Sequence, residues 1–295
     1  MIEGQKIIAF TPCGRKRYMD VLAGYVLREH ERGHIDEWIL FNNAYLKEDS
    51  TLAAQFAERF PWVTVLHDTS EGGAESGLHS HHARQGLDHI CEFYQFMTEG
   101  DGVVYVRLDD DIVYIDENAI PRLVKYRLAN PDPFLVFPTI INNVRTSYHM
   151  QQAGIIPKSW GEIKNEMGDT VAMKNFPFVS NLHRKALDAI ERGTLVEEFT
   201  LPSETFADWD AGHISINTFA MLGRDMVSVK VVHPEEDCLA LQLPKELNRH
   251  NARCGDAVVI HFAFHTQTEA MDQSGALAYY VKLAPPLGFQ TIGAT

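Results

Sequence analysis

Short apolar runs alternate with helix-like segments through residues 1–116 of the chain. The apolar runs are too short for helices and are rich in β-branched residues, which predicts buried strands at 6–10, 38–41, 63–66 and 103–108. Between them, apolar residues recur at helical spacing, which predicts helices at 18–32, 52–60 and 82–97. Strand and helix in this rhythm predict an α/β fold with a mostly parallel sheet flanked by helices.

The second part of the chain is less regular. The same criteria predict helices at 120–128, 181–192 and 213–222, and strands at 134–137, 227–232 and 258–265. Residues 144–177 show no clear periodicity and receive no predicted element. We find no repeat and no linker, so we expect one domain spanning 1–295 with an irregular C-terminal half.

Polar residues follow the predicted strands of the first half at the point where each strand ends. They comprise the turn Thr11-Pro12-Cys13-Gly14-Arg15, then Asn42-Asn43, His67-Asp68 and Asp109-Asp110-Asp111. In a parallel α/β sheet, ligands bind outside the carboxyl ends of the strands. The sequence therefore predicts a ligand site that includes these residues.

Three consecutive acids, Asp109, Asp110 and Asp111, separate two apolar runs. Like charges this close repel one another, and burial penalises each ionised form. A divalent cation relieves both costs, and carboxylate oxygens suit Mg²⁺ or Mn²⁺. If the backbone here is strand-like, Asp109 and Asp111 share a face and Asp110 points away. The alternative is a surface turn between two strands.

Several other residues are candidates for ligand contacts. Backbone N–H groups of the first turn, together with Arg15, suit the base, ribose or phosphate of a nucleotide, although the turn has no glycine-rich fingerprint. The alternative is a plain turn from strand to helix. Arg107, inside the central strand, either pairs with an acid or lies near an anionic ligand. His261, at the end of a predicted strand, suits a metal shell, and His265 is a weaker candidate. The cluster of His79, His81 and His82 either lines a pocket or begins a solvated helix.

A transfer to a hydroxyl group requires a carboxylate near the attacking oxygen. Asp208 and Asp210 precede a predicted helix, where an acid also interacts favourably with the helix dipole. The acidic trio Glu235-Glu236-Asp237 is the rival, or a solvated loop. Four aromatic residues suit sugar stacking or a plain core position, namely Trp160, Trp209, Phe176 and Phe178.

Composition narrows the class of partner. The chain has 295 residues and a formal net charge of -14, which argues against a nucleic-acid partner. The four cysteines form no CxxC pair, so we expect reduced thiols and a cytoplasmic setting. We see neither a signal-peptide pattern nor an apolar run long enough for a transmembrane segment.

The order of these features resembles the GT-A glycosyltransferases. The resemblance covers the topology of most of the chain and matches individual residues at Asp109–Asp111. It implies a nucleoside-diphosphate sugar donor and Mn²⁺ or Mg²⁺ as cofactor. It also implies that Asp109 and Asp111 hold metal and diphosphate, that Asp110 contacts the donor, and that His261 completes the metal shell. Thr11, Pro12, Gly14, Arg15, Asp68 and Arg107 would then contact the donor.

The resemblance further implies a donor-binding half at 1–116 and an acceptor-binding half at 117–295. The family's acidic loop before a helix corresponds loosely to Asp208-Trp209-Asp210, which lacks the family's Glu-Asp pair, so Glu236 or Asp237 stays an alternative base. An inverting enzyme would use such a base, whereas a retaining enzyme needs none. The acceptor would be a glycan or a small molecule, and the oligomeric state is open.

We therefore expect a metal-dependent glycosyltransferase. One alternative keeps the fold and joins a sugar phosphate to a nucleoside triphosphate, although the first loop lacks the glycines and lysines that favour a triphosphate. The other alternative is a non-catalytic module that binds a sugar or a metal.

Overall fold

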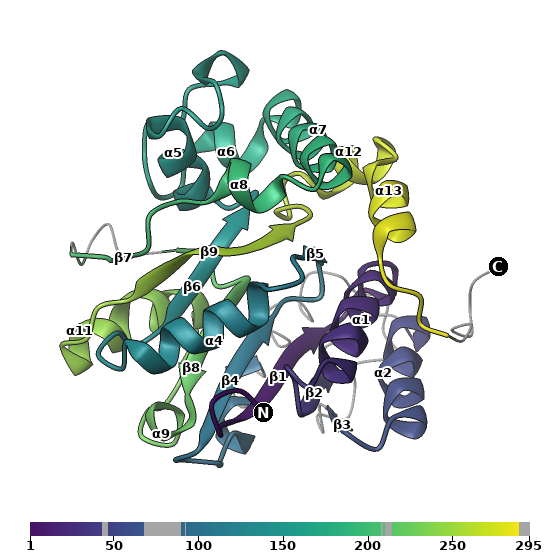
Figure 1. Cartoon of the computed structure of the whole chain (residues 1–295), viewed down its shortest axis with the longest axis vertical. Helices are drawn as coiled ribbons and strands as arrows, with labels where there is room; N and C mark the ends of the chain where they lie inside the picture. The colour runs from purple at the N-terminus through teal and green to yellow at the C-terminus, as the bar shows by residue number, and fades with distance from the viewer. Residues whose placement is uncertain (43–46, 68–89, 92, 208, 210–213, 289–295) are drawn as a thin grey trace.

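One sheet runs through the molecule (Figure 1). The structure, a computed structural model, describes residues 1–42, 47–67, 90–91, 93–207, 209 and 214–288. Its strand order is β3-β2-β1-β4-β8-β6-β9-β5, and β7 pairs with β9. The strands are β1 (Lys6–Cys13), β2 (Glu37–Asn42), β3 (Val63–His67), β4 (Val103–Leu108), β5 (Ile112–Ile115), β6 (Val136–Ile141), β7 (Glu204–Thr205), β8 (Thr218–Leu222) and β9 (Ala252–His261).

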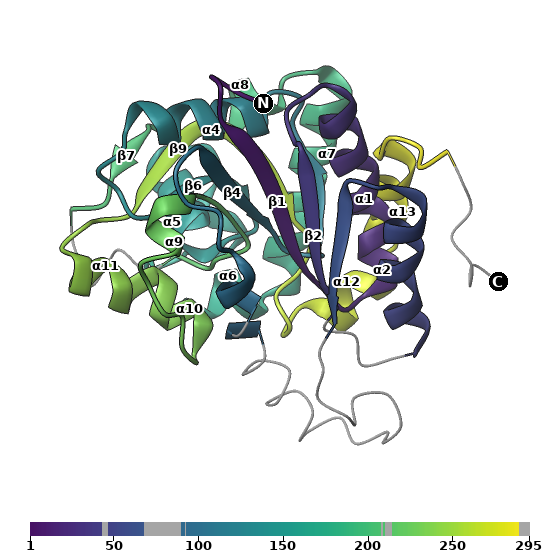
Figure 2. The same ribbon diagram turned by 90° about the horizontal axis from the view of Figure 1, so that it is seen from below.

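Helices cover both faces of this sheet. Figure 2 shows α1, α2 and α13 together beside β1 and β2, with α10 on the other side of the molecule from α4. The helices are α1 (Lys16–Glu31), α2 (Lys47–Arg59), α4 (Ala119–Ala129), α5 (Val144–Gln152), α6 (Thr170–Lys174), α7 (Phe176–Arg192), α8 (Leu195–Phe199), α9 (Gly223–Met226), α10 (Glu235–Asp237), α11 (Leu243–Leu247), α12 (Thr268–Gln273) and α13 (Ala276–Leu283). Within the described ranges, no helix has the length and apolar character needed to cross a bilayer.

The four strands β3, β2, β1 and β4 are parallel neighbours. Their carboxyl ends therefore meet at one edge of the sheet, as the sequence predicted. The sheet as a whole is mixed, because four of its eight strand pairings are parallel and four are antiparallel. The expected α/β fold, a sheet flanked by helices, is confirmed, but the expectation of a mostly parallel sheet holds only for this first half.

The helix α1 confirms the helix predicted at 18–32 and shows why the elements of the first half could be predicted from the sequence. Its apolar residues recur at helical spacing, and the resulting face, which includes Leu22 and Val26, is fully buried. The chain turns out of the helix at Gly33, whose φ of 73° is a conformation that glycine adopts without strain.

The helix predicted at 213–222 is wrong in the part of it that the structure describes, residues 214–222. Residues 218–222 instead form β8, an antiparallel strand between β4 and β6 with all five side chains buried. A short apolar run that is buried on both faces has no distinguishing period, so periodicity alone cannot separate strand from helix. The ring of Phe219 lies against Phe10 and Phe137 in the core of the sheet.

Other boundaries in the second half also differ. The strand predicted at 227–232 is absent from this described segment, where Val227 and Val232 are exposed. Strand β9 ends at His261, so its predicted continuation through 265 is wrong. The region 144–177, which had no predicted element, contains α5 and α6. Short helices begun by side-chain caps have too few turns to show a period: Asn143 accepts a hydrogen bond from the Thr146 N–H, and Asp169 caps α6.

Candidate active site

Asp109, Asp110 and Asp111 form a tight turn between β4 and β5, closed by a 3.1 Å hydrogen bond from the Ile112 N–H to the Asp109 carbonyl. The strand-like alternation considered for these acids therefore does not apply. The turn is not a surface turn either, because Asp110 and Asp111 are each only 4% exposed. Two carboxylates buried this deeply require cationic partners.

Arg15 is the first such partner. Its guanidinium forms ion pairs with Asp110 and, at 2.9 Å, with Asp111. The Gly14 N–H also donates a 3.0 Å hydrogen bond to Asp110 Oδ2. The structure thus brings together the acids and the turn after β1, two segments nearly 100 residues apart that were predicted independently.

The beginning of that turn was misplaced. Thr11 and Pro12 lie inside β1, paired with residues of β2, and the turn starts at Gly14. Thr11 is fully buried, and its hydroxyl accepts a 3.0 Å hydrogen bond from the Trp38 indole N–H. Its side chain therefore supports the packing of β1 on β2, and we withdraw it as a donor contact.

His261 is the second partner of Asp111. Its Nε2 lies 3.3 Å from Asp111 Oδ2, and its Nδ1 lies 2.9 Å from the Asn142 carbonyl, to which it donates. Because Nδ1 carries a proton, Nε2 and the carboxylate must share a cation, either a second proton or a metal ion. Burial acts to lower the pKa of His261, but Asp111 outweighs it and raises that pKa. Burial likewise acts to raise the pKa of Asp111, but Arg15 and His261 outweigh it and lower that pKa.

Asp109 has a different set of contacts. Arg107 Nε donates to Asp109 Oδ1 at 2.8 Å, and Asn217 Nδ2 donates to Oδ2 at 3.3 Å. Burial raises the pKa of Asp109 to about 7, with Asp111 adding to the rise and Arg107 opposing it.

Arg107 is paired with acids, one of the two alternatives that the sequence left open. Its Nη1 donates to the Tyr94 hydroxyl at 2.6 Å and also pairs with Glu235, while the Tyr94 hydroxyl donates to Glu235 at 2.6 Å. This buried network joins β4 to α10. Tyr94 was not predicted as a site residue, and Glu235 was predicted only as part of an acidic trio.

The structure separates the members of that trio. Glu235 is buried against Arg107, Glu236 accepts a 3.1 Å hydrogen bond from Ser215 Oγ, and Asp237 is exposed. Asn217 was not predicted, and it enters the site because β8 brings it next to Asp109. Asn142 follows β6 with a φ of 65°, and it was not predicted as a site residue.

Some predicted residues lie elsewhere. Asp68, Asp208, Asp210 and the cluster of His79, His81 and His82 lie outside the described residues. His265 is exposed, and Phe178 is buried in the core. Trp209 stacks on His250 with ring centroids 3.7 Å apart.

The donor chemistry at Asp111 fits a divalent cation. In the described part of the chain, no group of three or more His, Cys, Asp or Glu side chains is arranged to hold a metal ion as it stands. However, Asp111 Oδ1 is buried without a hydrogen-bond partner, and His261 Nε2 faces the same carboxylate. An unpaired carboxylate oxygen beside an imidazole nitrogen is a ligand pair that Mn²⁺ and Mg²⁺ accept.

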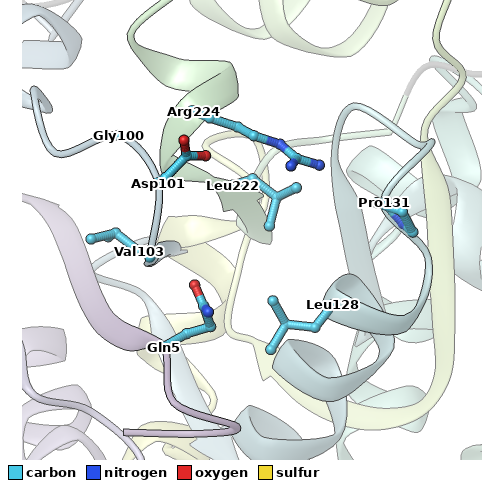
Figure 3. A pocket seen from close by; sticks show the side chains of 9 residues that line it. Gln5, Gly100, Asp101, Val103, Leu128, Pro131, Leu222 and Arg224 are labelled. Carbon is cyan, nitrogen blue, oxygen red and sulfur yellow. The ribbon is translucent and has the colours of Figure 1, made fainter.

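A separate cavity of about 440 Å³ lies at the opposite end of the parallel strands (Figure 3). Figure 3 shows Gln5 before β1, Asp101 and Val103 at the start of β4, and Arg224 in α9 around this cavity. None of these residues was predicted as a site residue. The acids therefore lie at the carboxyl ends of the parallel strands, and this cavity lies at their amino ends.

No family model and no curated protein match this sequence. Solved structures similar in fold include a mannosyltransferase from Pyrobaculum calidifontis in complex with GDP-Man and Mn²⁺, at 11% identity and a TM-score of 0.46, covering 94% of this chain and 63% of that chain. Glucosyl-3-phosphoglycerate synthase from Mycobacterium tuberculosis, in complex with Mn²⁺, UDP and phosphoglyceric acid, has 12% identity and a TM-score of 0.43, covering 96% and 80%.

CMP:2-keto-3-deoxy-manno-octonic acid synthetase in complex with CTP is also similar, at 9% identity and a TM-score of 0.44, covering 92% of this chain and 98% of that chain. At these identities the similarity concerns the overall fold, and we transfer no residue role from it.

Proposed function

We propose that this protein is a metal-dependent glycosyltransferase that moves a sugar from a nucleoside-diphosphate sugar to a hydroxyl acceptor. The observation that supports it most is the buried Asp111, whose unpaired Oδ1 and neighbouring His261 lie at the carboxyl edge of a parallel sheet. Arg15, 38% exposed, lies beside the same carboxylate. A cation and an arginine side by side suit a diphosphate group.

In this proposal each residue has a distinct task. Asp111 and His261 hold Mn²⁺ or Mg²⁺, which when bound offsets the charge that grows on the departing diphosphate. Arg15 and the Gly14 N–H contact the donor diphosphate. In this structure the Arg15 guanidinium pairs with Asp110, and the Gly14 N–H donates a hydrogen bond to it. Arg107 and Asn217 fix the orientation of Asp109 beside the donor. The family resemblance alone assigns a donor contact to Asp68, and it alone assigns to Asp210 the role of accepting the proton of the acceptor hydroxyl.

The test is Asp111→Asn, with Asp101→Asn as the matched control at the opposite edge of the sheet. Melting temperature is measured with a panel of nucleoside diphosphates and their sugars, with and without Mn²⁺, because ligand binding to the native state raises it. We expect a Mn²⁺-dependent rise in the wild type and the control and none in Asp111→Asn. Sugar transfer should fall more than about 100-fold in Asp111→Asn, since a metal ligand is lost. Unchanged metal-dependent transfer would contradict the proposal.

The two alternatives give different results in the same assays. A nucleotidyltransferase would release pyrophosphate when a nucleoside triphosphate and a sugar phosphate are added. A non-catalytic module would bind the nucleotide sugar without turnover across the acceptor panel.

A further inference from the structure

The cavity of about 440 Å³ at the amino ends of the parallel strands is a second candidate binding site. Small-molecule sites in proteins have volumes of about 300–1,000 Å³, so a small compound fits it. Its wall forms where β4 begins, where β8 ends and where α9 follows, and no residue of the acidic turn belongs to it. A compound bound here would therefore not contact Asp111 or His261.

Three polar side chains of this wall are available to a ligand. In the part of the chain that the structure describes, the side chains of Gln5, Asp101 and Arg224 form no hydrogen bond and no ion pair. Figure 3 shows all three around one space, with Gln5 on the other side of it from Arg224. Together they offer one negative charge, one positive charge and one amide group to the same compound.

The surroundings of Arg224 carry positive charge. Arg249 binds both carboxylate oxygens of Asp225, at 2.7 and 2.9 Å, and the fully buried Arg127 lies 3.7 Å from the same carboxylate. Burial lowers the pKa of Arg127 to about 10, with Arg249 and Arg224 adding to the fall and Asp225 opposing it. Two arginines thus share one aspartate beside Arg224. An anionic group of a ligand at Arg224 would offset this positive charge.

The surroundings of Asp101 leave room for a cation. Glu99, the nearest acid before it in the chain, already pairs with Lys6 at 2.8 Å. Asp101 lies between Gly100 and Gly102, and a Cβ at either glycine would meet no atom within 4 Å. The space beside the Asp101 carboxylate is therefore open to a positively charged group of a ligand.

The rest of the wall is mostly apolar. Val103 and Leu222 are buried, Leu128 is half-buried, and Figure 3 shows the two leucine side chains directed into the space between the polar groups. Arg224 also borders a second cavity, of about 530 Å³, but the described residues of that wall include no valine, leucine or isoleucine. Contact with an aliphatic group is therefore offered by the first cavity and not by the second.

We propose that the cavity of about 440 Å³ binds a free α-amino acid with an apolar side chain. Arg224 binds its carboxylate through two parallel hydrogen bonds, the geometry in which a guanidinium and a carboxylate pair best. Asp101 binds its ammonium group, and Leu128 and Leu222 contact its side chain. This inference goes beyond the proposed function and does not depend on it, because no proposed donor or metal contact lines the cavity.

Other classes of ligand fit this wall less well. A phosphate or a dicarboxylate would place a like charge beside Asp101, and a diamine would place one beside Arg224. A neutral sugar would leave both charges without a counter-charge. A compound that carries both charges on an apolar body uses the whole wall.

The test is Arg224→Gln, with Arg192→Gln as the matched control. Arg192 is 53% exposed, pairs with Glu198 and is not part of the cavity wall. Binding of L-leucine is measured by calorimetry and by the rise in melting temperature, because a ligand that binds the native state raises it. We expect leucine to bind wild type and control equally. It should bind Arg224→Gln at least about ten-fold more weakly, since a charge-assisted contact is lost.

Analogues of leucine test each contact separately. Leucinamide lacks the carboxylate, 4-methylpentanoate lacks the ammonium group, and glycine lacks the apolar body. Each should bind the wild type at least about ten-fold more weakly than leucine does. Tighter binding of the dipeptide glycyl-leucine than of leucine would contradict the assignment to a free amino acid.

Two further variants separate this site from the candidate active site. Asp101→Asn should weaken leucine binding at least about ten-fold, because the charge that attracts the ammonium group is lost. The same variant should bind nucleotides with Mn²⁺ as the wild type does, since Asp101 lies outside the proposed donor site. Asp111→Asn should bind leucine as the wild type does.

The outcomes keep this inference apart from the proposed function. If none of leucine, valine, methionine and phenylalanine binds the wild type, this inference is wrong, whatever the result with nucleotide sugars. If Arg224→Gln and Asp101→Asn both bind leucine as tightly as the wild type, leucine binds elsewhere and the inference is wrong as well. If leucine binds as expected but no nucleotide sugar does, only the proposed function fails.

Discussion

The two halves of the sheet are built in different ways. In the parallel half, β1, β2 and β3 follow one another in the chain, with one helix between each strand and the next. These successive strands are also neighbours in the sheet, and they are parallel. In the mixed half, β8 inserts between β4 and β6, and β9 pairs with β6, β5 and β7. Local crossovers thus determine one half, and pairings between distant segments determine the other.

The candidate site lies where these two halves meet. Asp111 contacts His261, Arg107 pairs with Glu235, and Asp109 contacts Asn217. In each pair the first residue belongs to residues 1–116 and the second to residues 117–295. The halves share one sheet and one buried charge network, so a change in either half should be felt in the other.

Of the substitutions considered, Glu235→Ala should lower the free energy of unfolding most, because it removes the ion pair between Arg107 and Glu235 that joins the two halves. It leaves the Arg107 guanidinium buried with one of its two acids removed, and breaking a buried ion pair costs about 3–5 kcal/mol of unfolding free energy. Denaturant unfolding of wild type and variant measures it. Glu162→Gln, which removes an exposed ion pair, should leave the midpoint unchanged. Equal effects of the two variants would mean that Glu235 does not hold the halves together.

Gly255→Ala tests the crowding of the mixed half. A Cβ at Gly255 in β9 would overlap the carbonyl of Leu201, while a Cβ at Gly100, before β4, meets no atom within 4 Å. Overpacking of this kind costs about 3 kcal/mol. Thermal and denaturant unfolding should show that loss for Gly255→Ala and almost none for Gly100→Ala. A tolerant Gly255 would show that β9 can move away from the 201–203 segment.

His183, in the mixed half, should make the free energy of unfolding depend on pH. It is buried between the Tyr280 hydroxyl at 2.7 Å and the Phe262 carbonyl at 2.9 Å, and burial lowers its pKa to about 3. The unfolded chain therefore binds the extra proton first, and stability falls as pH drops from 6.5 towards 3, by about 1.4 kcal/mol per pH unit.

At pH 5 this amounts to about 2 kcal/mol relative to pH 7. His183→Gln should flatten the profile between these two values, although it lowers stability at both. His265→Gln, at an exposed position, should keep the wild-type profile. A wild-type slope in His183→Gln would assign the acid sensitivity to other groups.

Thr11→Val should have the smallest effect and concerns the parallel half. It removes the acceptor of the Trp38 indole N–H and leaves a buried donor unpaired, which costs about 1–2 kcal/mol. Because the Thr11 side chain points into the packing of β1 on β2, affinity for a nucleoside diphosphate should not change. Calorimetry together with unfolding separates the two effects. Weaker ligand binding with unchanged stability would restore Thr11 as a donor contact.

Much of the candidate site was predictable, though not its pairings. The acids, Arg15 and His261 were found because polar residues directly after buried strands are unusual and parallel strands end at one edge. Asn217 and Tyr94 were missed because both lie in segments predicted as helices, where a single asparagine or tyrosine has no local pattern that marks it as a site residue. The partner of Arg107 could not be predicted either, because Glu235 lies 128 positions away along the chain.

The sequence by itself determined the parallel half, because the period of a helix or the length of a buried run depends only on residues a few positions apart. Tertiary structure alone decided that 218–222 is a strand, that Arg15 bridges Asp110 and Asp111, and that His261 faces Asp111. Those outcomes depend on which distant segments share a sheet. That choice is made by burying apolar surface and pairing buried charge across the whole chain, and no window of neighbouring residues contains it.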